Sequence, residues 1–183
     1  MFYYFSKFVL WLLGWKVTGN YPSQVKKMIL VAAPHTSNWD FPLGVMVRSV
    51  IRADVKYIGK ASLFKAPLGW ILKPLGGIPV DRSKSNNFVE AVVKEFNGKK
   101  ELCVLFAAEG SRKKVERFKT GFYHIARQAK VPMLPAILDY KKKEFRFQEL
   151  VWATENHEED LRQIEDIFRG IIGYHPNKSF GAN

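Results

Sequence analysis

The sequence predicts an α/β fold: a single domain with a mostly parallel, mixed sheet flanked by helices, and one more helix at the N-terminus. Two patterns predict this fold. Short apolar runs, of which LCVLFA at 102–107 is the clearest, have the length and composition of buried strands. Between such runs, segments such as 41–51 repeat apolar residues at the spacing of one helix face. Strands that alternate with helices form a sheet covered by helices.

Length and composition agree with one folded domain. A chain of 183 residues is about the size of a single domain, and a hydrophobic fraction of 47% excludes intrinsic disorder. A single cysteine, Cys103, excludes an intramolecular disulfide and a Cys-rich zinc site, and fits a reducing compartment. No apolar run reaches the roughly 18 residues that a membrane-spanning helix needs.

The first element expected is a helix over residues 1–16. The segment MFYYFSKFVLWLLGW contains seven aromatic residues and one charge, Lys7, and no small-residue cleavage site follows it. Aromatic rings settle at the bilayer interface, and Lys16 with the nearby Lys26 and Lys27 can meet anionic headgroups. We therefore expect a helix that lies in a membrane surface. The alternative is a helix packed onto the domain's own core.

The segments up to residue 80 are expected to form strands and helices in turn. The run at 28–33 is apolar and ends at a proline, which predicts a buried strand. The helix at 41–51 and a strand at 55–58 follow. Residues 63–75 are an aromatic-rich helix or loop interrupted by two prolines, and 78–80 is extended.

The second half continues the alternation. Ser85 and Thr120 have the side chains of helix N-caps, and Asn97-Gly98 is a helix stop. Three consecutive lysines at 141–143 mark a turn before an antiparallel strand. The expected elements are a helix at 85–98, a strand at 102–107, a helix at 120–130, a strand at 133–138, a terminal strand that includes Phe145, Phe147 and Val151, and a helix at 158–172.

The charge is unevenly distributed along the chain. Residues 149–183 hold three basic and seven acidic residues, a net charge of −4. Because the whole chain has a net charge of +12, the first 148 residues have a net charge of +16. A field of this size attracts polyanions: nucleic acid, an anionic bilayer or phosphorylated small molecules. The alternative is that the charge only maintains solubility.

Three turns that follow expected strands carry reactive side chains. In the first, a His at a strand end and an Asp that enters the next helix, His35 and Asp40, can meet across the turn. The carboxylate would hold one ring nitrogen protonated and leave the other to act as a general base. The alternative is a helix N-cap at Asp40 with an incidental histidine.

The other two turns carry arginines. A guanidinium at Arg82 can bind a phosphate or pair with the adjacent Asp81. After the clearest strand, Gly110 permits a tight turn, Ser111 offers a hydroxyl and an amide, and Arg112 adds a cation. Together these three residues form a candidate oxyanion or phosphate cradle.

In this order, the blocks resemble those of the glycerolipid acyltransferases of the lysophosphatidic acid (1-acylglycerol-3-phosphate) acyltransferase type. The similarity runs from about residue 28 to 140. The usual Pro before the third block's Glu is Ala108, and its usual Thr is Ser111; both changes preserve the charged pair and the hydroxyl. A Lys-x-x-Leu-Phe-Lys run typical of the family begins at Lys60. The four matching blocks are His35–Asp40, Gly77–Arg82, Ala107–Arg112 and Val131–Pro135.

The resemblance implies that residues 17–183 are an acyltransferase domain. It would move a fatty acyl group from an acyl-carrier-protein or coenzyme A thioester to the free hydroxyl of a lysophospholipid, foremost 1-acylglycerol-3-phosphate, giving phosphatidic acid. His35 would be the base and Asp40 its partner, with Lys60 and backbone amides of the His35 turn as candidate donors to the thioester oxygen. Arg82 and Arg112 would bind the acceptor phosphate.

The same resemblance assigns Glu109 to bracing an arginine or the loop. We expect no bound cofactor and no metal, because the other three histidines have no second ligand at a useful spacing. The partners expected are an anionic membrane surface, the lysophospholipid and the acyl donor. The location expected is the cytoplasmic face of the cell membrane, as a peripheral or monotopic protein.

Three other interpretations remain open. The first is the same chemistry on another lysophospholipid or on a lyso-aminolipid. The second is a silent lipid-binding module, against which the intact His35 and Asp40 pair argues. The third is a basic nucleic-acid-binding domain, which the aromatic and basic residues at 141–147 favour. No nucleic-acid motif accompanies them, so we expect no nucleic-acid partner.

Overall fold

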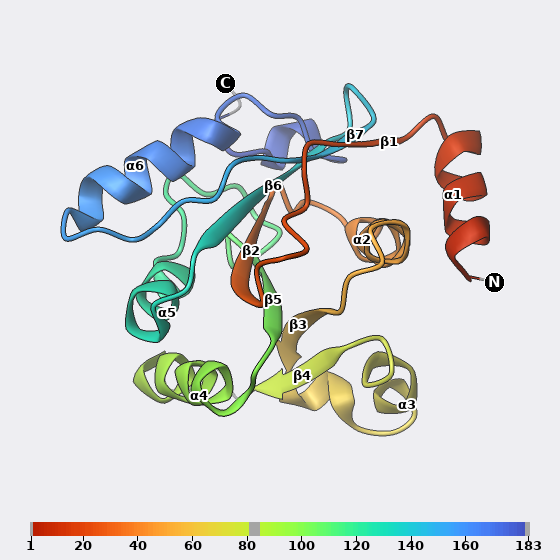
Figure 1. The fold of residues 1–183 in the computed structure, drawn as a ribbon. Coiled ribbons are helices and arrows are strands. Elements are labelled where there is room, and N and C mark those ends of the chain that lie inside the picture. The colour runs from red at the N-terminus through yellow and green to blue at the C-terminus, as the bar shows by residue number, and fades with distance from the viewer. Residues whose placement is uncertain (1, 81–84, 182–183) are drawn as a thin grey trace.

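A twisted sheet forms the centre of the molecule (Figure 1). In residues 2–80 and 85–181, which the computed structural model describes, seven strands form this sheet in the order β1-β7-β6-β2-β5-β3-β4. All neighbouring strands of that sheet run parallel except β6 and β7. The strands are β1 (Lys16–Thr18), β2 (Lys27–Ala33), β3 (Val55–Lys60), β4 (Gly77–Val80), β5 (Leu102–Ala107), β6 (Met133–Asp139) and β7 (Glu144–Phe147).

Helices cover both faces of the sheet. In Figure 1, α1, α2 and α3 lie on one side of it, and α4, α5 and α6 lie on the other. No helix in the described ranges is both long and apolar enough to cross a bilayer. The helices are α1 (Phe2–Leu12), α2 (Asp40–Val50), α3 (Leu68–Leu72), α4 (Ser85–Gly98), α5 (Gly121–Ala129) and α6 (His157–Phe168), with short 3₁₀ turns η1 (Ala61–Phe64) and η2 (Pro176–Lys178).

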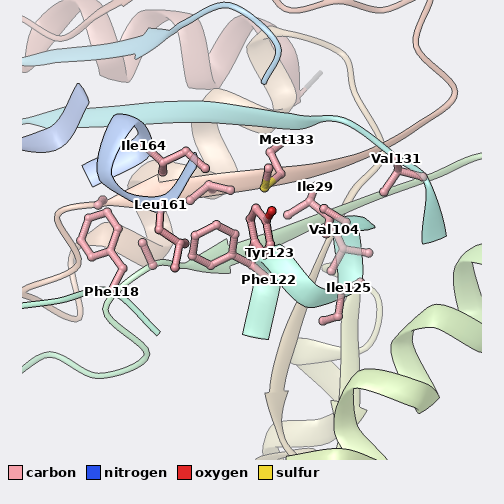
Figure 2. Close-up of a cluster of buried hydrophobic side chains, with 14 of the residues drawn as sticks. Ile29, Val104, Phe118, Phe122, Tyr123, Ile125, Val131, Met133, Leu161 and Ile164 are labelled. Carbon is pink, nitrogen blue, oxygen red and sulfur yellow. The ribbon is translucent and has the colours of Figure 1, made fainter. Parts of the chain in front are cut away.

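The alternation of side chains along β2 builds two cores. Met28 and Leu30 point to one face, where they pack with Leu10 of α1 and with Leu43 and Val47 of α2. The intervening residues of β2 point to the other face, under α4, α5 and α6. Figure 2 shows that second cluster, which includes Ile29, Val104, Phe122, Tyr123, Met133, Leu161 and Ile164. Because β2 is buried on both faces, its sequence is a continuous apolar run.

These observations confirm the predicted fold class. Phe145 and Phe147 lie on the antiparallel strand β7 as expected, but Val151 lies outside β7 and forms a separate antiparallel bridge with Met133. Three further details differ from the expectations. The first helix ends at Leu12, because Gly14 takes a left-handed conformation with φ of 75° and the chain then enters β1. The last helix ends at Phe168 and not at residue 172, with Gly170 at φ of 76° just beyond it. Thr120 occupies the N-cap of α5, yet its side chain makes no capping hydrogen bond.

The short strand β1 was not expected from the sequence. It contains three residues and pairs parallel with β7 at the edge of the sheet, so no apolar run marks it. The segment predicted as a helix or loop at 63–75 becomes η1 and α3, with a cis peptide bond at Ala66-Pro67 between them. Both differences lie at the margins of the sheet and leave its carboxyl edge as predicted.

Candidate active site

The candidate site lies at the carboxyl edge of the three central strands. β2 pairs with β5 on one side and with β6 on the other, all parallel, so their last residues reach the same edge. His35 stands two residues after β2, Glu109 two residues after β5 and Tyr140 directly after β6. Asp40 begins α2 at that edge. Ligands of open α/β sheets bind at this kind of edge.

His35 and Asp40 meet across a tight turn. The His35 Nδ1 and the Asp40 Oδ2 are 3.0 Å apart. The backbone amides of Thr36 and Ser37 donate hydrogen bonds of 2.9 and 3.0 Å to the same oxygen. The carboxylate therefore closes the turn and fixes the ring beside it. Because Asp40 occupies Nδ1, the Nε2 of His35 is the ring nitrogen left to exchange a proton with another molecule.

The Asp40 carboxylate is buried and held in its ionised form. Its side chain is 5% exposed, whereas that of His35 is 28% exposed. Burial alone would raise the pKa of Asp40, but the hydrogen bonds from His35, Ser37 and Tyr140 outweigh it and hold this pKa below its ordinary value. The pair thus consists of a fixed buried anion and a partly exposed imidazole.

Tyr140 is a member of this site that the sequence reading did not single out. Its hydroxyl donates a 2.7 Å hydrogen bond to the Asp40 Oδ1. The ring is held edge-on between Trp15, at 4.9 Å, and Tyr174, at 5.4 Å between ring centroids. Burial, followed by the Asp40 carboxylate, raises the pKa of Tyr140, so the hydroxyl remains a donor. Its place directly after a parallel strand was the one signal available in the sequence.

Glu109 is attached to the same turn from the neighbouring strand. Its Oε1 accepts a 2.8 Å hydrogen bond from the backbone amide of His35, and the residue is 1% exposed. Among the described residues, its buried Oε2 has no hydrogen-bond partner. Burial raises the pKa of Glu109 although the His35 amide opposes the shift. The carboxyl group therefore links the segments that follow β2 and β5 through Oε1, and its Oε2 accepts no hydrogen bond from the described residues.

The remaining residues of the third block lie on an exposed turn. Gly110 adopts a φ of 65°, a conformation that suits glycine. The Ser111 hydroxyl accepts a 3.3 Å hydrogen bond from the Lys113 amide, and Arg112 is exposed. Within the described part of the chain, no hydrogen bond or ion pair joins Ser111 or Arg112 to the His35 and Asp40 pair. The structure brings Glu109 to the pair but leaves Arg112 in solvent.

Lys60 and Arg82 complete the set of predicted site residues. Lys60 ends β3 at the same edge of the sheet, where it is the register partner of Val80. Its backbone is described, and its side chain is not. Arg82 lies outside the described residues.

Backbone amides of the His35 turn were candidates for binding the thioester oxygen. The structure gives these amides other partners: those of Thr36 and Ser37 donate to Asp40, and that of His35 donates to Glu109. The expectation for these three amides is therefore wrong, because each is engaged in holding the turn. Lys60 remains the candidate donor from that group.

Neither a nucleophilic cysteine nor a cluster of metal ligands is found in the described part of this site. Cys103 lies within β5, is 8% exposed, and burial raises the pKa of its thiol to about 11, so the nucleophilic thiolate is disfavoured. In residues 2–80 and 85–181, no three His, Cys, Asp or Glu side chains converge as a metal site requires.

Comparisons with known proteins agree with this geometry. A family model described as Acyltransferase matches residues 14–139. The chain is 29% identical over 133 residues to a 1-acyl-sn-glycerol-3-phosphate acyltransferase of Salmonella typhimurium, covering 68% of this chain and 53% of that protein. It is 30% identical over 145 residues to the protein of the same description from Saccharomyces cerevisiae, covering 75% and 46%. The chain thus spans about half the length of these curated relatives.

A solved structure shares the fold. The crystal structure of the 1-acyl-sn-glycerophosphate acyltransferase PlsC from Thermotoga maritima aligns with a TM-score of 0.55 and 20% sequence identity, covering 91% of this chain and 78% of that one. At this identity the likeness shows the fold alone. The family model covers well over half of the sequence, from the end of the first helix to the end of β6. This chain belongs to the Acyltransferase family.

Proposed function

We propose that this protein transfers a fatty acyl group from a thioester to the free hydroxyl of a lysophospholipid, foremost 1-acylglycerol-3-phosphate, to give phosphatidic acid. The observation that carries the proposal is the His35 and Asp40 pair: a partly exposed imidazole fixed by a buried, ionised carboxylate at the carboxyl edge of the sheet. The relatives named 1-acyl-sn-glycerol-3-phosphate acyltransferase support the choice of acceptor.

The geometry supports His35 as the general base. Its Nε2 takes the proton of the acceptor hydroxyl as that oxygen bonds to the thioester carbonyl carbon. Asp40 stabilises the resulting imidazolium through Nδ1. When the tetrahedral intermediate collapses, the carbon–sulfur bond breaks and the imidazolium returns its proton to the leaving thiolate. No acyl-enzyme is needed, and Cys103, buried and protonated, is left out of the chemistry.

Cationic groups complete the proposed site. Lys60 would donate to the developing oxyanion from the end of β3. Arg82 and Arg112 would bind the acceptor phosphate, and the exposure of Arg112 leaves its guanidinium available for that contact. Glu109 would brace the His35 turn through the amide bond that it accepts, with Gly110 and Ser111 shaping the loop.

The donor proposed is an acyl-carrier-protein or coenzyme A thioester, which acts as a co-substrate and not as a bound cofactor. Another lysophospholipid or a lyso-aminolipid is the alternative acceptor. The two arginines in the matching blocks favour an anionic acceptor over an uncharged one.

We further propose that the protein works at an anionic membrane surface, on the cytoplasmic face. α1 supports this proposal because most of its aromatic side chains point away from the domain: Phe5 and Phe8 are 57% exposed and Trp11 is 72% exposed. Its inner face, with Ser6 and Leu10, packs against the domain. The two alternatives for this helix are therefore compatible: one face packs onto the core of the domain, and the other has the composition of a bilayer-interface helix.

An assay with two donors tests this function. Purified protein is given detergent-solubilised 1-acylglycerol-3-phosphate with acyl-carrier-protein or coenzyme A thioester, and phosphatidic acid is measured. A lysophospholipid with a neutral headgroup is the matched acceptor control. Formation of phosphatidic acid by the wild type and not by His35→Ala supports the proposal. Faster turnover of the neutral acceptor would show that another lysophospholipid, and not 1-acylglycerol-3-phosphate, is the preferred acceptor.

A further inference from the structure

The short helix α3 exposes more apolar surface than its packing requires. Leu68, Trp70 and Ile71 are 54%, 76% and 62% exposed. Single exposed apolar residues are ordinary, but three within one turn of helix form a patch. Because most of the surface of Trp70 and Ile71 is exposed, burial in the core does not explain why they are apolar.

Other residues hold α3 in place. Phe64, at the end of η1, is 8% exposed and packs against Gly59 of β3 and Gly77 of β4, where an added Cβ would collide with its ring. The Tyr57 hydroxyl donates a 3.0 Å hydrogen bond to the carbonyl of Leu72. The helix is therefore fixed from its inner side, and its outer apolar side chains are free to contact something else.

The patch lies on the same side of the sheet as α1. Figure 1 shows α1, α2 and α3 together on that side. Phe2 of α1 and Leu75, three residues beyond α3, line the same hollow of about 270 Å³. On the same segment as the site, Trp39 is 63% exposed directly before Asp40, and the ring of Phe41 contacts that of Tyr57 at 5.1 Å between centroids. The exposed apolar residues of α1 and α3 thus lie on one side of the sheet, and the hollow that Phe2 and Leu75 share is also lined by the C-terminal end of α2.

The charge of this side matches an anionic surface. Residues 1–80 contain ten Lys and Arg and only two acidic residues, a net charge of +8. Lys65 and Lys73 border α3, and both are exposed; within the described ranges neither forms an ion pair. The acidic residues of the C-terminal segment gather instead around α6, on the opposite face of the sheet. The N-terminal part of the chain, which contains α1, α2 and α3, is therefore basic, and the acidic C-terminal segment lies away from these helices.

We propose that Leu68, Trp70 and Ile71 insert into the surface of an anionic lipid bilayer, as a second contact beside α1. This inference rests on the proposed function in one respect: a lipid acceptor gives the protein a reason to bind a bilayer. Two separated contacts fix the tilt of the domain, which one helix cannot do.

An acidic carrier protein is the competing partner for such a surface. The observations favour a bilayer because the apolar residues of α3 are large and more than half exposed, and because exposed lysines, Lys65 and Lys73, border them. Aromatic rings bordered by lysines are the composition of an interfacial element. The carrier protein is therefore an outcome that the experiment must distinguish.

The first measurement is vesicle sedimentation of the whole 183-residue chain. We compare the wild type with Trp70→Ala/Ile71→Ala, using phosphatidylcholine vesicles with and without phosphatidylglycerol. Trp152→Ala is the matched control. Trp152 is a tryptophan outside α3 that is 58% exposed, and it directly follows Val151, which pairs with Met133 of β6. The double variant should bind anionic vesicles about tenfold more weakly or worse, whereas the control binds as the wild type does. Circular dichroism checks that both variants fold.

The second measurement places a reporter on α3 without removing its tryptophan. Ile71→Cys is labelled with a polarity-sensitive fluorophore, and Trp152→Cys serves as the control; the native Cys103 is buried and stays unlabelled. Anionic vesicles should shift the emission at position 71 to the blue, and salt above about 0.1 M should reduce the shift. Position 152 should not respond.

Three results would overturn the proposal: equal vesicle binding by the double variant, no emission change at position 71 while the protein sediments with vesicles, or a change there with acyl-carrier-protein and not with vesicles. Neither measurement requires turnover. A protein that binds vesicles through α3 but makes no phosphatidic acid would contradict the proposed function and leave this inference standing.

Discussion

The hydroxyl of Tyr140 donates a 2.7 Å hydrogen bond to the Asp40 Oδ1, the carboxylate oxygen that His35 does not contact. His35 and two backbone amides occupy the other oxygen, so both oxygens of a buried carboxylate have partners. The Tyr140 ring also contacts Trp15, which directly precedes β1. The segment that follows α1 is therefore in contact with Tyr140, which holds the carboxylate that fixes the His35 imidazole.

Replacing Tyr140 by Phe should lower kcat by about ten- to hundredfold, because a hydrogen bond to an ionised group contributes about 1.5–3 kcal/mol. The ring contacts with Trp15 and Tyr174 remain in this variant. Loss of the donor also raises the pKa of Asp40, so activity on the acid side should begin to fall at a higher pH than in the wild type. Tyr174→Phe is the control; an unchanged pH profile for Tyr140→Phe would assign Tyr140 a packing role only.

His35→Ala should lower kcat by about 10²–10⁴, the usual contribution of a positioned base. Asp40→Asn should be comparably severe, because an amide cannot stabilise the imidazolium. Steady-state kinetics with thermal unfolding as a folding control checks this. Substantial turnover by folded His35→Ala would remove His35 as the base.

Glu109→Gln separates charge from hydrogen bonding. The amide oxygen still accepts from the His35 backbone, so the turn should keep its shape. Because burial raises the pKa of Glu109, its ionisation costs stability as pH rises above the unfolded value of 4.5 through the folded one. The variant should therefore be more stable than the wild type at neutral pH and equally stable below pH 4.5. Urea unfolding across that range measures the difference; a constant difference contradicts it.

Arg112→Ala should raise the KM of a phosphate-bearing acceptor by about ten- to hundredfold and leave the donor KM nearly unchanged, since a charge-assisted contact is lost. Lys113→Ala, an exposed cation on the same turn, is the matched control. Initial rates over a grid of both substrates give the two constants. Equal effects on donor and acceptor would show that Arg112 supports the loop instead.

The outer face of α1 can be tested without disturbing its inner face. Phe8→Ala/Trp11→Ala should release the protein from anionic vesicles and leave thermal stability almost unchanged, because both side chains are exposed. Leu10→Ala should instead destabilise the fold by about 2–5 kcal/mol, since Leu10 is buried against α2. Deleting the first fifteen residues would mix these effects, because it also removes Trp15 from Tyr140.

Local sequence determined the elements and the pair of catalytic candidates. Apolar runs such as 102–107 mark strands because a parallel strand is buried on both faces, and that pattern is independent of its partners. His35 and Asp40 could be paired in advance because five residues of turn bring them together. The short, solvent-exposed edge strand β1 left no such pattern, so it could not be predicted.

Only the tertiary structure decided what surrounds the pair. Tyr140 is 100 residues from Asp40 and Glu109 is 74 residues from His35, and both arrive because β6 and β5 are the neighbours of β2. The order of strands depends on how the helices pack, which no local spacing records. The same holds for α1 and α3: their sequences are apolar, but which side chains are core and which face outward is fixed by contacts with α2, β3 and β4.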